Sequence, residues 1–226
     1  MAQSKAEMLL TEADTYLKNA KYDVALSKIQ EALKLEPGNK KAMEMEINIY
    51  YLQDDYKEAY NLVEKALEKY PDESEFYYQR GLIFNGRQKY GKAVDDFDKV
   101  INMNSGTELY KVYLNRGIAN MNMMEYERAT EDFTKSIELN GNNASAYHSR
   151  GMLNYQLKDY GASVKDFKKA LEINSENPET SFNLGMSYFR LDDIDNACPY
   201  FQKACKEGNV NACKMVLMEC AKNLPK

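Results

Sequence analysis

A period of 34 residues runs through this chain and constrains its fold more than any other feature. Three similar segments, YYQRGLIF, YLNRGIAN and YHSRGMLN, each contain a glycine, and a fourth glycine follows in register. These are Gly81, Gly117, Gly151 and Gly185, which are 36, 34 and 34 residues apart. A self-similar unit of this length indicates a repeat protein, in which each unit packs mainly on its neighbours. We therefore predict six repeats, at about 6–39, 40–73, 74–109, 110–143, 144–177 and 178–208.

The second half of each repeat has the pattern of an amphipathic helix. In the first five repeats it begins at a tyrosine, namely Tyr22, Tyr56, Tyr90, Tyr126 and Tyr160. Small and apolar residues follow at i+3, i+7 and i+10 or i+11, a spacing that places one apolar stripe along a helix. Glycine or alanine at the crossing points lets two helix backbones approach closely. Each repeat is therefore expected to be a pair of helices, and residues 209–223 a single capping helix.

The repeat resembles the tetratricopeptide repeat, whose motif combines an aromatic residue, Leu-Gly, Tyr, two alanines around an aromatic residue, and a proline. The first position is filled by Leu9, Met43, Tyr77, Tyr113 and Tyr147, with Ser181 in the last repeat. Only Pro37 and Pro71 keep the terminal proline. The resemblance covers about residues 6–208. It implies an all-α fold, a right-handed superhelical solenoid of six antiparallel helix pairs plus the capping helix, forming a single solenoid over residues 1–226.

One step of the period is 36 residues long because two residues are added around Gly106 and Thr107. A turn insertion of this size costs little conformational entropy, and we take it as the simpler interpretation. The alternative is a change of twist between repeats three and four.

Two positions of the repeat vary together, which predicts contact between the two helices of a pair. Repeats three to five have arginine at the first position and aspartate at the second, whereas repeat one exchanges the charges and repeat six has two apolar residues. Repeat two breaks the pattern with Glu46 and Leu62. In chain order the other pairs are Glu12 and Lys28, Arg80 and Asp96, Arg116 and Asp132, Arg150 and Asp166, and Leu184 and Tyr200. The arginines are thus expected to form ion pairs within repeats rather than a catalytic row.

Charge and hydropathy exclude several classes of function. The 226 residues contain 30 Lys and Arg against 35 Asp and Glu, a formal net charge of −5, with no basic block. This balance disfavours nucleic acid or an anionic membrane surface as the main partner. The mean hydropathy of −0.67 and the lack of a long apolar stretch predict no membrane span.

We expect no catalysis, because the residue patterns that support it are missing. His148 is the only histidine, and the sequence contains no zinc-protease, P-loop or dinucleotide-binding motif. Neighbouring acids such as Asp95 and Asp96 point about 100° apart on a helix, so they do not form an acid–base pair. The sequence therefore predicts no cofactor and no metal site, and His148 is expected to be a polar groove or surface residue.

The resemblance implies that the first helix of each pair lines a concave groove, which receives an extended peptide or a helix of a partner protein. The predicted groove residues lie opposite the stripe that packs between repeats, and in the C-terminal half they are mostly apolar. The alternative for each of them is packing against a neighbouring helix. The candidates are Glu44, Asn48, Tyr51, Tyr78, Asn85, Lys111, Leu114, Ile118, Met121, Asn122, His148, Met152, Tyr155, Phe182, Met186 and Phe189.

One subgroup of the family grips the acidic C-terminal tail of heat-shock proteins with a carboxylate clamp of Lys and Asn, then Asn, then Lys and Arg. Repeats two to four supply Asn48, Gln79 and Lys111 at these positions, but Glu44 replaces the first Lys and Asn115 replaces the Arg. An added anion and two missing cations would face an anionic ligand. We therefore predict that the chain is not a binder of acidic chaperone tails.

Two functions from different classes follow. The first is a non-catalytic scaffold that binds an unidentified protein or peptide in the groove through apolar contacts of repeats four to six. The second is a structural subunit that self-associates through its ends or its convex face. The residues 1–5 have no apolar core of a signal peptide, so the default compartment is the cytoplasm; an exported chain whose leader had been removed would look the same.

The four cysteines are symmetric about residue 209, in the turn between the last repeat and the cap. Residue 209 is the midpoint of Cys198 and Cys220, and also of Cys205 and Cys213. Each pair would therefore lie side by side in a helical hairpin. Cysteines seven residues apart on one helix are about 10.5 Å apart, which excludes a single four-cysteine zinc site. The spacing permits cross-helix disulfides, and the Cys205–Cys213 bond is the more favourable. The alternative is four reduced cysteines that fill the core.

Overall fold

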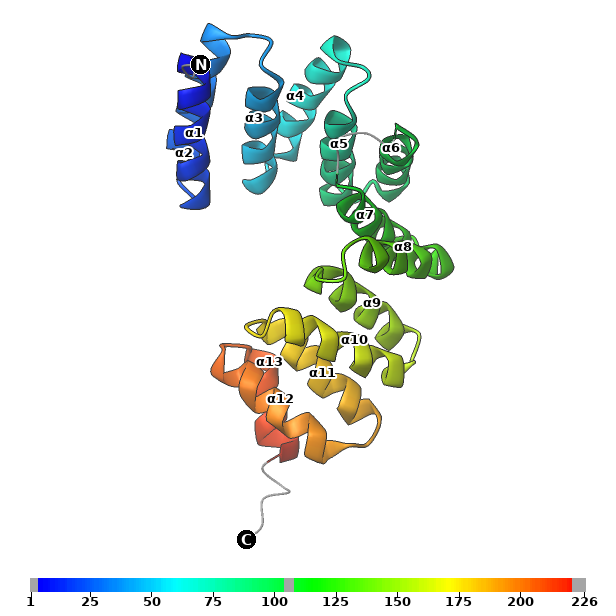
Figure 1. Cartoon of the computed structure of the whole chain (residues 1–226). Helices are drawn as coiled ribbons and strands as arrows, with labels where there is room; N and C mark the ends of the chain where they lie inside the picture. The colour runs from blue at the N-terminus through cyan, green and yellow to red at the C-terminus, as the bar shows by residue number, and fades with distance from the viewer. Residues whose placement is uncertain (1–3, 104–107, 221–226) are drawn as a thin grey trace. The chain divides into compact units, whose positions relative to one another are not determined.

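The computed structural model describes residues 4–103 and 108–220, and within them the chain forms helices joined by short turns. Figure 1 shows the helices in order along the chain, which divides into two compact units, residues 1–108 and 109–226. The first unit contains three helix pairs. They are α1 (Lys5–Lys18) with α2 (Tyr22–Leu35), α3 (Lys40–Leu52) with α4 (Tyr56–Lys69), and α5 (Ser74–Gly86) with α6 (Tyr90–Met103).

The second unit contains three further pairs and a C-terminal cap. The pairs are α7 (Leu109–Asn122) with α8 (Tyr126–Leu139), α9 (Ala144–Gln156) with α10 (Tyr160–Ile173), and α11 (Pro178–Arg190) with α12 (Ile194–Lys206). The all-α class, the six pairs and the expected starts of the second helices at tyrosine are confirmed. The added residues Gly106 and Thr107 lie outside the described residues.

The two helices of a pair approach each other through a glycine and a phenylalanine 16 residues later. A Cβ atom added to Gly81, Gly117, Gly151 or Gly185 would lie only 2.6 to 2.8 Å from the ring of the phenylalanine that follows in its pair. These rings, Phe97, Phe133, Phe167 and Phe201, are fully buried. The predicted close approach of the two backbones at glycine is therefore confirmed. Because an alanine methyl would overlap the ring, the glycine is required by packing.

The predicted pairs of charged residues also connect the two helices. Arg80 Nε and one terminal nitrogen donate to the two carboxylate oxygens of Asp96 at 2.8 and 2.7 Å, and Arg150 binds Asp166 in the same way at 2.9 and 2.8 Å. Arg116 Nη2 lies 2.6 Å from Asp132. The ion pairs expected within repeats are therefore present, and because the aspartates are buried they differ from exposed surface pairs, which contribute little.

Two of these arginines also reach the preceding repeat, at the mirrored spacing of 16 residues. Arg80 also binds Glu64 on α4, at 2.6 Å, and Arg150 donates to Thr134 on α8, at 3.1 Å. The exchanged pair of the first repeat is present as well, since Lys28 Nζ lies 2.7 Å from Glu12. These side chains therefore join repeats as well as the helices within them.

The turn after the first helix of every pair contains a left-handed residue that is not glycine. Ala20, Asp54, Gln88, Met124, Lys158 and Asp192 have φ between 53° and 64°. In the first pair, the N–H of Ala20 donates to the carbonyl of Leu17 and that of Lys21 to the carbonyl of Tyr16, the two bonds of a Schellman motif. Residues other than glycine seldom adopt this conformation. Because none of the six positions holds a glycine, the sequence did not indicate these turns.

The C-terminal cap differs from the single helix expected over 209–223. The structure has a six-residue helix, α13 (Val210–Met215), followed by a π-helical turn, η1 (Val216–Cys220), and residues 221–223 lie outside the described residues. Two disulfides, Cys205–Cys213 and Cys198–Cys220, join the cap to α12. The second bond holds Cys220, 6% exposed, in the cluster around Leu184, Tyr188 and Phe201. This bond fixes the end of η1 against α12.

We expect the Cys205–Cys213 bond in protein purified without reductant, because the Cα atoms of these residues lie only 4.7 Å apart across the turn. Alkylation without reductant followed by peptide mass spectrometry should give a linked Cys205–Cys213 peptide. Closing so short a loop stabilises the fold by about 2–3 kcal/mol in the chain-entropy account. Four alkylated thiols in the intact chain would contradict the prediction.

Candidate functional site

The predicted groove residues lie on the first helices of the pairs, and none of the sixteen is buried. Asn48, Lys111 and Asn122 are exposed, and the other thirteen are half-buried. A face that served only to pack helices together would bury its large apolar members completely. The burial pattern therefore fits side chains that contact the core on one side and are open on the other. That these residues form a groove stays a prediction.

In the second unit the open face is mostly apolar. Leu114, Ile118 and Met121 of α7 pack at the edge of a cluster formed by Ala129, Phe133 and Leu153. On the next helices, four side chains pack at the edge of the cluster that contains Phe167 and Phe201. These four are Met152 on α9 and Phe182, Met186 and Phe189 on α11. Three successive first helices thus carry adjoining half-buried apolar side chains.

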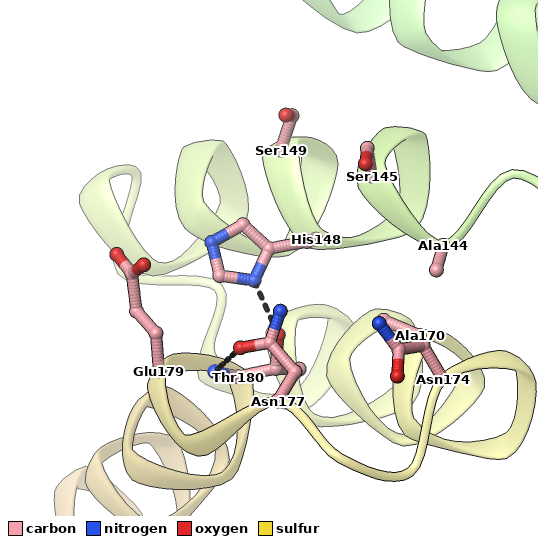
Figure 2. A pocket seen from close by; sticks show the side chains of 9 residues that line it. All are labelled: Ala144, Ser145, His148, Ser149, Ala170, Asn174, Asn177, Glu179 and Thr180. Carbon is pink, nitrogen blue, oxygen red and sulfur yellow. Dashed lines mark hydrogen bonds between the residues drawn. The ribbon is translucent and has the colours of Figure 1, made fainter. Parts of the chain in front are cut away.

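A polar cavity of about 150 Å³ lies between α9 and α11, at the end of α10. Figure 2 shows the His148 ring between the two helices, with Nδ1 2.8 Å from Thr180 Oγ1. The N–H of Thr180 donates to Asn177 Oδ1 at 2.9 Å, so α11 begins with its own side-chain cap. Glu179 is the only acid that lines the cavity. The cavity is large enough for one small ring or side chain.

His148 is held by packing on its other side. Its ring centroid lies 5.4 Å from that of Phe167, the residue that closes on Gly151. Burial lowers the pKa of His148, and the negative charge of Glu179 opposes this shift. The neutral ring suits hydrogen bonding more than charge pairing. The sequence marked His148 as a groove residue but not Thr180, although their separation of 32 residues is close to one period.

In the first unit the open face is more polar and contains an unusual carboxylate. Glu44 on α3 is half-buried, and its pKa rises from 4.5 to about 7. Burial is the main cause, and the negative charges of Glu75 and Glu73 add to it. Gln79, which the clamp pattern would place in the groove, is instead 9% exposed and donates from Nε2 to the main-chain oxygen of Glu44 at 2.9 Å.

The described residues offer neither a metal site nor a membrane helix. Within 4–103 and 108–220, no group of three or more His, Cys, Asp or Glu side chains is arranged to hold a metal ion. None of the described helices combines the length and the apolar character that crossing a bilayer requires. The expectations of no cofactor and of no acidic-tail binding stay predictions.

Comparison with known families supports the repeat assignment along most of the chain. Models described as tetratricopeptide repeat match residues 16–80 and, separately, 74–107, 110–143 and 178–207. A further model described as TPR repeat matches residues 151–192. A comparison with curated proteins gives no match.

Several solved structures share the fold at low sequence identity. PilW, described as a widely conserved type IV pilus biogenesis factor, is 20% identical, with a TM-score of 0.85 over 96% of this chain and 100% of its own. PilF of Pseudomonas aeruginosa is 18% identical, with a TM-score of 0.79 over 95% and 97%. YrrB, described as a TPR protein with an unusual peptide-binding site, is 18% identical, with a TM-score of 0.61 over 87% and 98%.

The raised pKa of Glu44 predicts a pH-dependent effect of Glu44→Gln. Because the folded state holds the proton of Glu44 more tightly than the unfolded state, this residue stabilises the fold below pH 4.5 and loses that contribution as the pH rises through about 7. The variant should therefore be more stable than the parent at pH 8, by about 1 kcal/mol after allowance for solvent screening, and not at pH 4.

Urea unfolding at both pH values measures this difference. Glu68→Gln on α4 changes the same chemical group at an exposed position and serves as the matched control. A Glu44→Gln effect that is the same at pH 4 and pH 8 would show that the carboxylate is not perturbed.

Proposed function

Because the chain belongs to the tetratricopeptide repeat family, we propose that it is a non-catalytic scaffold that binds a peptide or helix of a partner protein. Proteins of this family are protein-interaction scaffolds, and both the family and the fold neighbours are typically non-catalytic. The proposed contact surface is the row of apolar side chains on α7, α9 and α11. One observation carries the proposal: these large apolar side chains are half-buried on three successive helices instead of being enclosed in the core.

The chemistry of this row suits a partner that buries apolar side chains. Methionine is flexible and polarisable, and aromatic rings supply large contact area at low entropic cost, so Met121, Met152 and Phe189 adapt to varied surfaces. A contiguous apolar patch on a protein surface is typical of an interaction site. His148, which lines the polar cavity, is one turn before Met152 on α9, and the cavity would accept one side chain of the bound segment.

A second function, self-association through an end of the chain, is favoured by the cap. Val210, Leu217 and Met218 are 68%, 74% and 58% exposed, which is high for large apolar residues. They lie on α13 and η1, and not on the helices α7, α9 and α11 that carry the row. A subunit that assembled through this end would bury them against another copy.

The experiment compares capture of partners by four forms of the full chain. Each form would be immobilised and exposed to an extract of the source cells, with quantitative mass spectrometry as the measurement. The four forms are the parent, the double variant Met121→Glu with Met152→Glu, and the single variants Leu139→Glu and Leu217→Glu. Leu139 is 48% exposed at the end of α8 and is the matched control for a new charge at an apolar site. A charge placed in the apolar row should reduce capture of the partner about tenfold or more.

Light scattering after size exclusion separates the two functions. If the scaffold function is right, the double variant Met121→Glu with Met152→Glu no longer captures the partner. Leu139→Glu captures the partner as the parent does, and the double variant has the same molar mass as the parent. If the parent is an oligomer that Leu217→Glu dissociates, self-association through the cap is supported instead. If the double variant captured the partner as well as the parent does, the groove proposal would be contradicted.

A further inference from the structure

Glu44 lacks the partner that a carboxylate in its position normally has. Its side chain is half-buried on α3, and no described residue forms a hydrogen bond or ion pair with its carboxylate. The nearest candidate cation, Lys40, is ion-paired with Glu73. Lys41 also acts on Glu44 through its charge, but it is exposed and makes no ion pair with it. Partial burial of an unpaired charge costs free energy, which the free protein has no contact to offset.

The neighbouring helix makes this place more negative. Glu73 is the N-cap residue of α5 and Glu75 lies in its first turn, and both disfavour ionisation of Glu44. The two lysines, Lys40 and Lys41, offset only part of this effect, because burial and the two acids together still raise the pKa of Glu44 to about 7. The face between α3 and α5 thus has an excess of negative charge.

Gln79 adds a second, independent observation. Only 9% of this residue is exposed, and its Nε2 is fixed by the bond to the main-chain oxygen of Glu44. Its Oε1 is buried and has no hydrogen-bond donor among the described residues. A buried acceptor without a donor is uncommon in folded proteins and calls for an explanation. The amide of Gln79 is thus anchored to the main chain of the residue whose carboxylate also lacks a donor.

We propose that the α3–α5 face of the first unit binds a lysine or arginine side chain of the partner segment at Glu44. An ammonium or guanidinium group has a positive charge and three to five N–H donors with no acceptor, and therefore supplies the charge and the donor that the Glu44 carboxylate lacks. An anionic segment would instead be repelled by the carboxylate of Glu44. A divalent metal is disfavoured because no group of metal ligands is arranged there among the described residues. The inference rests on the proposed scaffold function, since it names the charge of the segment bound.

This proposal also explains why a destabilising residue fits the function. A glutamate at this position weakens the free fold at neutral pH, and a bound cation removes that cost. Binding should then lower the pKa of Glu44 from about 7 toward its ordinary value, since a neighbouring positive charge favours the ionised form. The affinity for the basic segment should accordingly rise as the pH increases through 7.

Peptide selection on the full chain tests the proposal without knowledge of the natural partner. A displayed library of 12-residue peptides would be selected on the parent, on Glu44→Gln, on Glu44→Lys and on the exposed control Glu68→Gln. The parent and Glu68→Gln should enrich peptides with a lysine or arginine at one fixed position. Synthetic versions of these peptides should bind Glu44→Gln about tenfold more weakly, and Glu44→Lys should select acidic residues instead.

The outcomes separate this inference from the scaffold function. Peptides that depend on Met121 and Met152 but carry no basic residue, or that bind Glu44→Gln as well as the parent, would overturn the inference and leave the scaffold function standing. A selection that enriches no peptide on the parent would count against both. Circular dichroism of each variant shows whether it is folded, and the opposite preference of Glu44→Lys excludes simple loss of structure as the cause.

Discussion

The contact between a helix backbone and a phenylalanine ring, repeated in the last four helix pairs, determines how this chain can use its surface. Phe167 closes on Gly151, and the same ring packs against His148 one turn earlier on α9. Because that contact fixes how α9 is rotated, it also sets which side of the helix stays open. Met152 and Tyr155 consequently remain half-buried on the open side. Packing within a pair and the composition of the open face are therefore two results of one contact.

The two units present different chemistry on this open face. The second unit has adjoining methionine, phenylalanine and aliphatic side chains, and it contains the polar cavity at His148. The first unit has a half-buried glutamate near two further acids. A basic residue would match the first surface, and apolar side chains would match the second. Each unit can be tested by itself, because the double change of Met121 and Met152 is made independently of the changes at Glu44.

Much of the fold was predictable from the sequence because the period is a local property that six copies repeat. The helix pairs, the glycine positions and the contact between Arg150 and Asp166 follow from that internal comparison. The turns were less predictable, since residues such as Met124 and Lys158 adopt a left-handed conformation that favours glycine. The π-helical end of the cap was missed because α-helical spacing was assumed up to Cys220.

The candidate site was predictable in outline only. Helical phase indicated which residues share the open face, but it gave no measure of burial. The sequence showed Glu44 only as a departure from the clamp motif. Its lack of an ion pair depends on Lys40 binding Glu73, and its raised pKa depends in part on the negative charges of Glu73 and Glu75. Likewise Gln79, expected in the groove, is buried because its amide bonds the main chain of α3. Such features arise from contacts between repeats, which one repeat's sequence does not specify.

The most direct test of this account is the free energy of unfolding of Gly151→Ala measured beside Gly161→Ala. Both positions are helical glycines of the second unit, but a Cβ atom would lie 2.8 Å from Phe167 at Gly151 and meets nothing closer than 3.7 Å at Gly161. Alanine is favoured in helices by up to about 1 kcal/mol over glycine, so Gly161→Ala should be neutral or stabilising. Gly151→Ala should lose about 1–3 kcal/mol through overpacking. A Gly151→Ala protein as stable as its parent would contradict the claim that this contact holds the helix pair.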